Sequence, residues 1–359
     1  MMPGTSHRFS AEYPVREDDL YKKITNEAVA NGTNPCDEIV QNSSTVTVTV
    51  VPNVDEAIES ALAYILSCQN PDGGFGHMPG GSSSNIFTAE AAMALAQTGN
   101  LSSAVKGGKT LLDYLTAHPP GEDNNYAAYL GRYVMGILAA GGDPGNVEGV
   151  DYVQKLKEAS KNGLQSNYFA DALVVMGLAA TGQGESQEAR DYVSWVKAAQ
   201  SGGAWFGVDA TGLMVNALIA IGEPVESSTI QNAVGFLRRV QNSDGGFPAD
   251  AGAVSNSDSE EYVIMALNAM GDSMSDWSKN GNTPITHLLS CQQPGGVIWW
   301  KPDTAGANAY FMTQTAYGVI CLEGGYLPVV SQAGGINLSG NSSSSSANVK
   351  TEIAGAFTN

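Results

Sequence analysis

The stretch Leu237-Arg-Arg-Val-Gln-Asn-Ser-Asp-Gly-Gly-Phe247 decides how this chain folds. It ends an apolar helix at Gln241, turns at residues 244–246 and continues with an aromatic side chain. Glycine adopts backbone conformations that other residues avoid, and it commonly follows a helix end. The phrase recurs closely at residues 65–75 and more loosely at residues 196–205 and 289–299. A phrase that recurs along a chain indicates a structural repeat.

Six helical hairpins are expected between residues 54 and 327, with a period of about 45 residues. The first helix of each pair is amphipathic, whereas the second, as at residues 172–180, is almost entirely small and apolar. Helices that are apolar all round are buried on all sides. The pattern therefore predicts an all-α fold with an outer and an inner layer, and six hairpins can close into two concentric rings.

The expected helix pairs are 54–68 with 87–96, 104–116 with 126–140, 150–160 with 168–180, 189–199 with 210–221, 230–240 with 259–270, and 285–290 with 310–322. A glycine follows the second helix of every pair, at residues 99, 141, 182, 222, 271 and 324. These glycines are the expected caps of the helix C-termini.

The two ends of the chain differ from its middle. Residues 1–53 form an N-terminal arm in which residues 44–51 alternate at period two and predict a strand. That strand needs a partner, which is another segment, another domain or a neighbouring subunit, so self-association through it is one hypothesis. Residues 328–359 are a Ser/Asn-rich tail that is expected to be flexible.

The composition argues against some classes of binding partner. The 359 residues carry a formal net charge of -19, which argues against binding nucleic acid or an anionic membrane surface. No apolar run reaches about 18 residues, so no membrane-inserted helix is expected. Glycosylation sequons and few lysines favour an extracellular or cell-surface location; the sequons begin at Asn31, Asn42, Asn100, Asn337 and Asn341.

Cys68 and Cys291 occupy the same place in two copies of the phrase, one residue before the glutamine. We expect both to be simple buried thiols, because free cysteine packs as a small apolar residue. The alternative is a disulfide that joins the first and last repeats, which requires Cα atoms within about 7 Å.

The recurring Gln…Asp-Gly-Gly-Phe/Trp phrase, with inner helices such as Asp209-Ala-Thr-Gly-Leu-Met-Val-Asn-Ala-Leu218, resembles the prenyltransferase and squalene-cyclase repeat. The resemblance covers about residues 54–327 and implies an (α/α)6 toroid. The family includes class II terpene cyclases, protein prenyltransferase β subunits, thioester domains, cobalamin carriers and cell-surface proteins. The fold does not decide among these functions.

The resemblance also implies where a ligand would bind. All inner helices run the same way, so their N-termini and positive dipole ends meet at one end of the barrel, where the family's pocket opens. The candidate ligand-binding residues at or near these helix starts are Tyr126, Tyr129, Tyr168, Asp171, Trp205, Asp209, Asp258, Glu261, Trp299, Tyr310 and Gln314.

Asp209 is the candidate acid for a terpene-cyclase reaction. It matches the middle carboxyl of the family's Asp-X-Asp-Asp-Thr-Ala motif, but Gly207 and Ala210 replace the flanking carboxylates. An aspartate before a helix is also a good cap, and we expect that role to outweigh catalysis. The inner helices moreover carry alanine and glycine in place of the aromatic lining that carbocations need.

The other chemistries of the family are not matched. A prenyltransferase zinc site would keep Asp258, but Glu260 stands at the cysteine position and Gln314 at the histidine position. The thioester motif is absent, and the histidines (His7, His77, His118 and His287) lie outside the inner-helix starts. Asp258, Glu260 and Glu261 could bind Ca²⁺, although a solvated acidic helix start is favoured. No cofactor is expected.

These observations favour a non-catalytic extracellular module that binds an unidentified small molecule or protein, or that acts as a scaffold in a surface assembly. Two alternatives stay open. One is a cobalamin or corrinoid carrier, and the other is a degenerate class II terpene cyclase that uses Asp209 as its acid.

Overall fold

The computed structural model describes residues 23–33, 39–49, 51–121, 126–164, 167–305 and 311–329. Two compact units are distinguished. One contains a β-hairpin, and the other contains the helices that follow Asn53. Residues 330–359 of the C-terminal tail, Cys36 and Tyr310 lie outside the described residues.

The hairpin pairs β1 (Lys23–Thr33) with β2 (Ile39–Thr49) in an antiparallel ladder. Its register runs from the Lys23–Thr49 pair to the Thr33–Ile39 pair. The strand expected at residues 44–51 is the second half of β2, and its partner is another segment of the same chain. The predicted strand begins later than β2 does, because residues 41–44 are polar and lack the β-branched side chains that indicate a strand.

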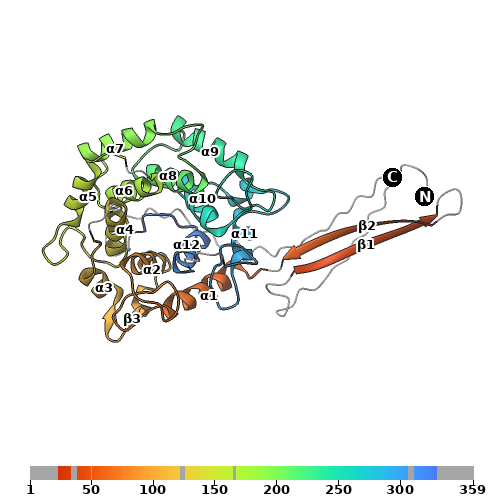
Figure 1. Ribbon diagram of the computed structural model, residues 1–359, viewed down its shortest axis with the longest axis horizontal. Helices are drawn as coiled ribbons and strands as arrows, with labels where there is room; N and C mark the ends of the chain where they lie inside the picture. Colours follow the sequence, from red (N-terminus) through yellow and green to blue (C-terminus); the bar gives the residue numbers. More distant parts are fainter. Residues whose placement is uncertain are drawn as a thin grey trace. The chain divides into compact units, whose positions relative to one another are not determined.

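The helices form two concentric rings (Figure 1). The outer helices are α1 (Val54–Ser67), α3 (Leu111–Ala117), α5 (Tyr152–Ser160), α7 (Gln187–Ala198), α9 (Ser228–Val240) and α11 (Pro284–Cys291). The inner helices are α2 (Asn85–Gln97), α4 (Tyr126–Ala139), α6 (Tyr168–Ala180), α8 (Val208–Ala220), α10 (Ser257–Met270) and α12 (Phe311–Leu322). Each inner helix contacts the next, and α12 returns to α2, which confirms the (α/α)6 toroid.

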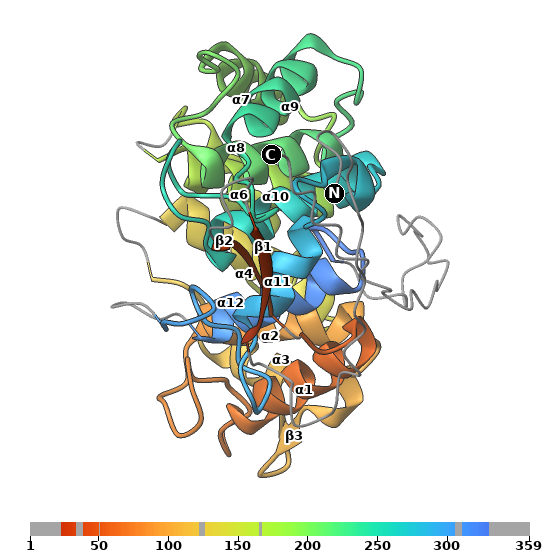
Figure 2. The same ribbon diagram turned by 90° about the vertical axis from the view of Figure 1, so that its right-hand side faces the viewer.

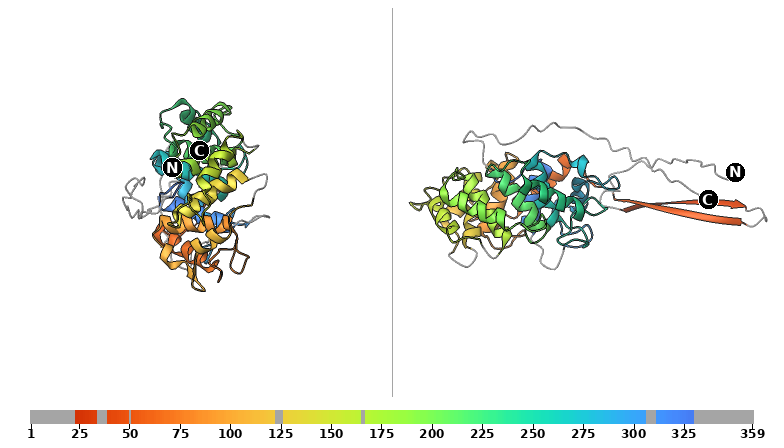
Figure 3. Two further views of the ribbon diagram at one scale, coloured as in Figure 1. Left: turned by 90° about the vertical axis from the view of Figure 1, so that its left-hand side faces the viewer. Right: turned by 90° about the horizontal axis from the view of Figure 1, so that it is seen from above.

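Further views show the same helices from other directions, with α1 in orange-red, α7 in green and α12 in blue (Figures 2 and 3). All six glycines expected to end the inner helices have positive φ, between 68° and 97°. Only glycine adopts this region without steric cost, so these positions stop the inner helices where the sequence predicts. Among the described helices, none is long and apolar enough to cross a bilayer.

The start of α3 was predicted wrongly. The helix begins at Leu111 and not at residue 104, because residues 105–110 form a small ladder of β3 (Val105–Lys106) and β4 (Lys109–Thr110). Gly107 and Gly108 both have positive φ and make the turn of this ladder. The helix then starts on a capping box between Thr110 and Asp113.

The glutamine of the recurring phrase connects neighbouring hairpins. The side-chain amide of Gln241 donates to the Gly245 carbonyl of its own turn (2.9 Å) and to the Trp277 carbonyl of the next hairpin (2.6 Å). The same pair of bonds recurs three times: from Gln69 to Gly73 and Ala104, from Gln200 to Gly203 and Thr229, and from Gln292 to Gly296 and Ala57. The 2.7 Å bond from Gln292 to Ala57 joins the last hairpin to the first and closes the ring.

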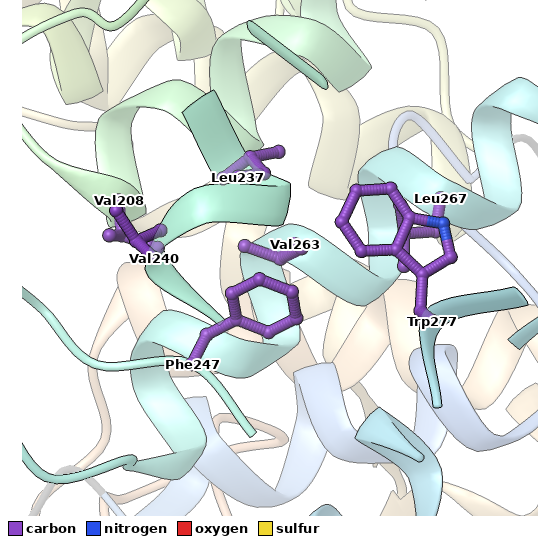
Figure 4. Close-up of a cluster of buried hydrophobic side chains, with 7 residues drawn as sticks. All are labelled: Val208, Leu237, Val240, Phe247, Val263, Leu267 and Trp277. Atoms are coloured by element: carbon purple, nitrogen blue, oxygen red, sulfur yellow. The ribbon is translucent and has the colours of Figure 1, made fainter. Parts of the chain in front are cut away.

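The aromatic residue of the phrase fills the space between the two layers. Phe247 has no exposed surface and lies 6.0 Å from the ring of Trp277, centroid to centroid. Figure 4 shows it in a cluster contributed by both layers, with Val208, Leu237, Val240, Val263, Leu267 and Trp277. Burying Phe247 contributes roughly 2–3 kcal/mol, so the phrase supplies both a polar link and an apolar anchor.

The disulfide alternative for Cys68 and Cys291 is wrong, because both thiols are free and buried. The Cys68 thiol donates instead to the Tyr64 carbonyl of its own helix (3.4 Å). Burial raises the pKa of Cys68 to about 11, so the thiol stays neutral and unreactive. The ring is closed by the Gln292 amide and not by a covalent bond.

We predict that Gln292→Ala lowers the free energy of unfolding by about 2–4 kcal/mol, because two buried carbonyls lose their donor. Urea denaturation followed by circular dichroism measures this change. Gln154→Ala on the exposed face of α5 is the control and should change stability by less than about 0.5 kcal/mol. Equal effects of the two substitutions would show that the glutamine link does not stabilise the ring.

Candidate functional site

Two aspartates occupy equivalent places at the starts of neighbouring inner helices. Asp209 is the second residue of α8, and Asp258 is the second residue of α10. The Asp209 carboxylate accepts a hydrogen bond from the Ser259 hydroxyl of α10. Asp258 is hydrogen-bonded to the side chain of Gln314 on α12. The toroid thus brings residues from three hairpins to one place.

The environment of this pair favours protonated carboxyls. Burial, with a smaller contribution from the nearby charge of Asp209, raises the pKa of Asp258 to about 6, although the hydrogen bond from Gln314 opposes the shift. Burial also raises the pKa of Asp209, with a contribution from Asp250. The Oδ1 atom of Asp209 is buried and has no hydrogen-bond partner among the described residues, which makes the ionised form still less favourable.

Glu261 adds a third carboxyl to the same region. It is 1% exposed, and burial, together with the charges of Asp258, Glu260 and Glu90, raises its pKa well above the usual value. Its Oε1 atom has no hydrogen-bond partner in the described part of the chain. Gly318 of α12 lies beside this carboxyl, and a Cβ at position 318 would clash with the Ile298 side chain at 2.2 Å.

A charged group lies farther along the inner helices, where α2 meets α4 and α12. The Glu90 carboxylate accepts from the Thr313 hydroxyl (2.7 Å) and lies 3.4 Å from the Arg132 Nε. The Tyr317 hydroxyl donates to Oε1 of the Glu90 carboxylate at 3.5 Å. Glu90 is fully buried, and Arg132 is 11% exposed. Arg132 and two hydroxyls thus satisfy the Glu90 carboxylate inside the ring.

Three aromatic rings accompany the carboxyls. Phe169 of α6 and Tyr262 of α10 meet edge to face with centroids 5.0 Å apart, and Tyr262 meets Tyr317 of α12 at 5.9 Å. The expectation of an inner wall without aromatics is therefore wrong for these helices.

The structure brings together four of the predicted site residues, namely Asp209, Asp258, Glu261 and Gln314. Two others lie elsewhere. Trp205 is fully buried and donates from Nε1 to the Val196 carbonyl of α7 (2.7 Å), so it fills the space between the layers. The Tyr192 hydroxyl of α7 donates to the Asp171 carboxylate, which therefore faces the outer helix.

The remaining predicted residues stay predictions. Tyr126, Tyr129, Tyr168 and Trp299 are partly exposed, at or before the starts of α4, α6 and α12. Tyr310 lies outside the described residues. Within those residues, no group of three His, Cys, Asp or Glu side chains is arranged to hold a metal ion, so the calcium hypothesis gains no support.

The sequence interpretation set His287 aside because it lies on an outer helix. The structure places its Nδ1 atom 2.6 Å from the Oε2 atom of Glu260, which begins the inner helix α10. Arg132, Tyr262 and Tyr317 were also missed, whereas Glu90 was expected at the start of its inner helix. A signal was available for Glu260, since the first turns of α2, α8 and α12 carry threonine at the corresponding place.

Comparison with known proteins supports the fold. Residues 166–320 match the squalene-hopene cyclase C-terminal domain, and residues 39–123 match the prenyltransferase alpha-alpha toroid domain. No curated protein matches the chain. A type II terpene cyclase from Scytonema is similar at 18% identity and TM-score 0.52, over 75% of this chain and 97% of that one. A polysaccharide lyase is similar at 10% identity and TM-score 0.52, over 76% and 98%. Two such different activities on one scaffold show that this likeness concerns the fold.

We predict a pH-dependent stability that Asp258 controls. Its folded pKa of about 6 lies above the unfolded value near 4, so the unfolded chain releases this proton first as pH rises. The stabilising contribution is present below about pH 4 and is lost as pH rises through 6. Asp258→Asn should therefore raise the free energy of unfolding by roughly 1–3 kcal/mol at pH 7 and change it little at pH 4.

Urea titrations at pH 4, 5, 6 and 7 measure this difference. The matched control is Asp191→Asn on the exposed face of α7, which should leave the pH dependence of stability as it is in the parent protein. Parallel stability curves for Asp258→Asn and the parent protein would contradict the prediction.

Proposed function

We propose that this chain, which is similar to the squalene-hopene cyclase C-terminal domain over residues 166–320 and to the prenyltransferase alpha-alpha toroid domain over residues 39–123, is an acid enzyme. The proposed reaction is protonation of a carbon–carbon double bond in an isoprenoid-type substrate. The Asp258–Asp209 pair is the proton source. This proposal takes up the terpene-cyclase alternative and moves the proton donor from Asp209 to the pair.

The observation that carries the proposal is the pair of carboxyls at equivalent positions of α8 and α10. An efficient general acid has a pKa near the working pH, and the pKa of Asp258 is raised to about 6. Gln314 orients Asp258, and the Asp209 charge disfavours ionisation of Asp258. In the proposed step, the Asp258 O–H bond breaks and a C–H bond forms at the alkene, which leaves a carboxylate and a carbocation.

In the proposed reaction, the aromatic rings of Phe169, Tyr262 and Tyr317 stabilise that cation. Their faces carry negative potential and stabilise positive charge where water is excluded. Loss of a proton from a neighbouring carbon, or addition of water, then yields a neutral product. Neither route requires a redox partner.

The missing flanking carboxylates were the main argument against Asp209. In the folded chain, Asp258 of the next inner helix lies close enough to interact with Asp209, and Glu261 interacts with Asp258. The acid group is thus assembled from neighbouring repeats and not from one contiguous motif. This supports the cyclase-like hypothesis over the capping role.

We expect Asp258→Asn and Asp209→Asn each to lower product formation from polyprenyl alkenes by about 10²-fold or more. Gas chromatography with mass spectrometry measures the product, and a reaction in D₂O should add one deuterium at the protonated carbon. Asp191→Asn is the control and should keep full activity. Unchanged turnover in both site variants would refute the assignment of the acid.

A scaffolding role is the competing proposal, and the β-hairpin is the observation that favours it. Each of its strands is eleven residues long and pairs with one neighbour within the described residues. Strand edges of this kind can receive another strand. Asn31 and Asn42 both lie in the hairpin, so a cell-surface location is part of this proposal. No specific contact favours the corrinoid carrier.

If the hairpin mediates assembly, deletion of residues 1–52 should convert an oligomer to a monomer while the helical unit stays folded. Size-exclusion chromatography with light scattering measures the mass, and circular dichroism confirms the helices. Replacing Val46 and Val48 with lysine is a milder variant that should also weaken pairing. The same mass with and without the hairpin would exclude the assembly role.

A further inference from the structure

The turns of the first and fifth hairpins share their hydrogen bonds. In both, an aspartate accepts from the backbone amide two residues on and from a serine hydroxyl eleven residues on. The distances are 3.0 and 2.9 Å for Asp72, and 3.1 and 2.8 Å for Asp244. The first hairpin therefore serves as an internal reference for what the fold alone requires.

The inner helix of the fifth hairpin departs from this reference. In three other hairpins, a threonine in the first turn accepts from the amide of the buried connector residue at 2.9–3.1 Å. These residues are Thr88, Thr211 and Thr315. In α10 the corresponding residue is Glu260, which is fully buried. A buried carboxyl is a costly substitute for a hydroxyl that would satisfy the fold.

The outer helix that packs on this turn departs as well. Tyr114 of α3 lies against the turn glycine of the first hairpin, and His287 of α11 lies against that of the fifth. A Cβ added at Gly74 would come within 2.6 Å of Tyr114, and one at Gly246 within 2.7 Å of His287. The two side chains thus occupy the same place, and only the histidine can carry a proton between two ring nitrogens.

His287 connects a buried carboxyl to an exposed one. Its Nδ1 atom lies 2.6 Å from Glu260 Oε2, and its Nε2 atom lies 3.7 Å from Asp244 Oδ2. The side chains are 0% exposed for Glu260, 7% for His287 and 45% for Asp244. The three groups therefore run from the solvent to the inner ring. Cys291 also packs near Glu260, but burial raises its pKa well above the usual value and keeps it neutral.

Glu260 leads on to the central carboxyls. Glu261 follows it in the chain, and the charge of Glu260 helps to raise the pKa of Glu261. One oxygen of each glutamate, Oε1, is buried without a hydrogen-bond partner in the described part of the chain. Buried acceptors without donors are places where a proton can reside.

We propose that Asp244, His287 and Glu260 form a proton relay that carries protons from solvent to the acid group of Asp258 and Asp209. The proposal rests on the proposed function, because only an acid that gives up its proton needs to be refilled. His287 takes a proton at Nε2 on the side of Asp244 and releases another from Nδ1 to Glu260. Glu260 passes its proton to the Asp258 carboxylate through Glu261. Each transfer leaves the His287 proton on Nε2, and rotation of the imidazole ring returns that proton to the side of Glu260 before the next transfer. Charge and atoms then balance, and the relay restores the acid after each turnover.

A purely structural role for these groups makes a different prediction. If the His287–Glu260 pair only holds α10 against α11, the residues of the first hairpin should replace it without loss. The double variant Glu260→Thr with His287→Tyr installs the Thr88 and Tyr114 pair that the same turn already accommodates. It therefore removes the relay while keeping a packing that this fold is known to accept.

With polyprenyl substrates, we expect the double variant to keep a normal first turnover in rapid-quench experiments and to lose at least tenfold in the steady-state rate. Imidazole or formate in the buffer should restore part of that rate. Asp244→Asn should show the same pattern more weakly. The matched control is Asp72→Asn, which changes the same turn position in the first hairpin and should leave both rates unchanged.

A second measurement does not depend on catalysis. Infrared spectroscopy follows the C=O band of protonated buried carboxyls as it shifts in D₂O. We expect this exchange to be at least tenfold slower in the double variant than in the parent protein or in Asp72→Asn. Equal exchange rates, or an unchanged steady-state rate, would overturn the relay. If no substrate is turned over but exchange slows, the relay stands and the proposed reaction fails.

Discussion

The toroid depends on one recurring interaction, the double hydrogen bond of a buried glutamine amide. At the end of an outer helix, the turn contains a glycine carbonyl that needs a donor. The next hairpin contributes a second backbone carbonyl close to it. A single amide nitrogen with two hydrogens satisfies both, as Gln241 does for Gly245 and Trp277. Gln292 makes the same bonds to the last turn and to Ala57 of α1, so the last hairpin is linked to the first. Four of the six junctions between hairpins carry this link.

This closure is what creates the candidate site. Six inner helices that run the same way bring their first turns to one end of the ring, so carboxyls that are far apart in sequence become neighbours. Asp209 and Asp258 alone would each be a helix-start aspartate of the usual kind. Burial raises the pKa of both carboxyls, and the charge of Asp209 adds to the shift of Asp258, whose pKa reaches about 6. Neither aspartate caps its helix, since the N-caps are Gly207 and Asn256, so the expected capping role of Asp209 is wrong.

The repeats also separate what the fold needs from what it merely tolerates. Thr88, Thr211 and Thr315 do the same structural work in three hairpins, which makes Glu260 conspicuous. Its partner His287 lies where the first hairpin has Tyr114. Both exchanges place a titratable group in the buried interior, which has a cost in stability. Such departures from an internal pattern are expected where function competes with the fold.

The sequence by itself determined the architecture. The Gln…Gly-Gly phrase, the small inner helices and their terminal glycines predict the six hairpins and most helix bounds. These signals are local, and most repeats contain them. Asp209, Asp258, Glu261 and Gln314 could be nominated for the same reason, as first-turn residues of inner helices. Only the tertiary structure decided which side chains meet. It paired β2 with β1, turned Trp205 and Asp171 toward the outer layer, and joined His287 to Glu260. Those contacts depend on ring closure and side-chain direction, which no local pattern encodes.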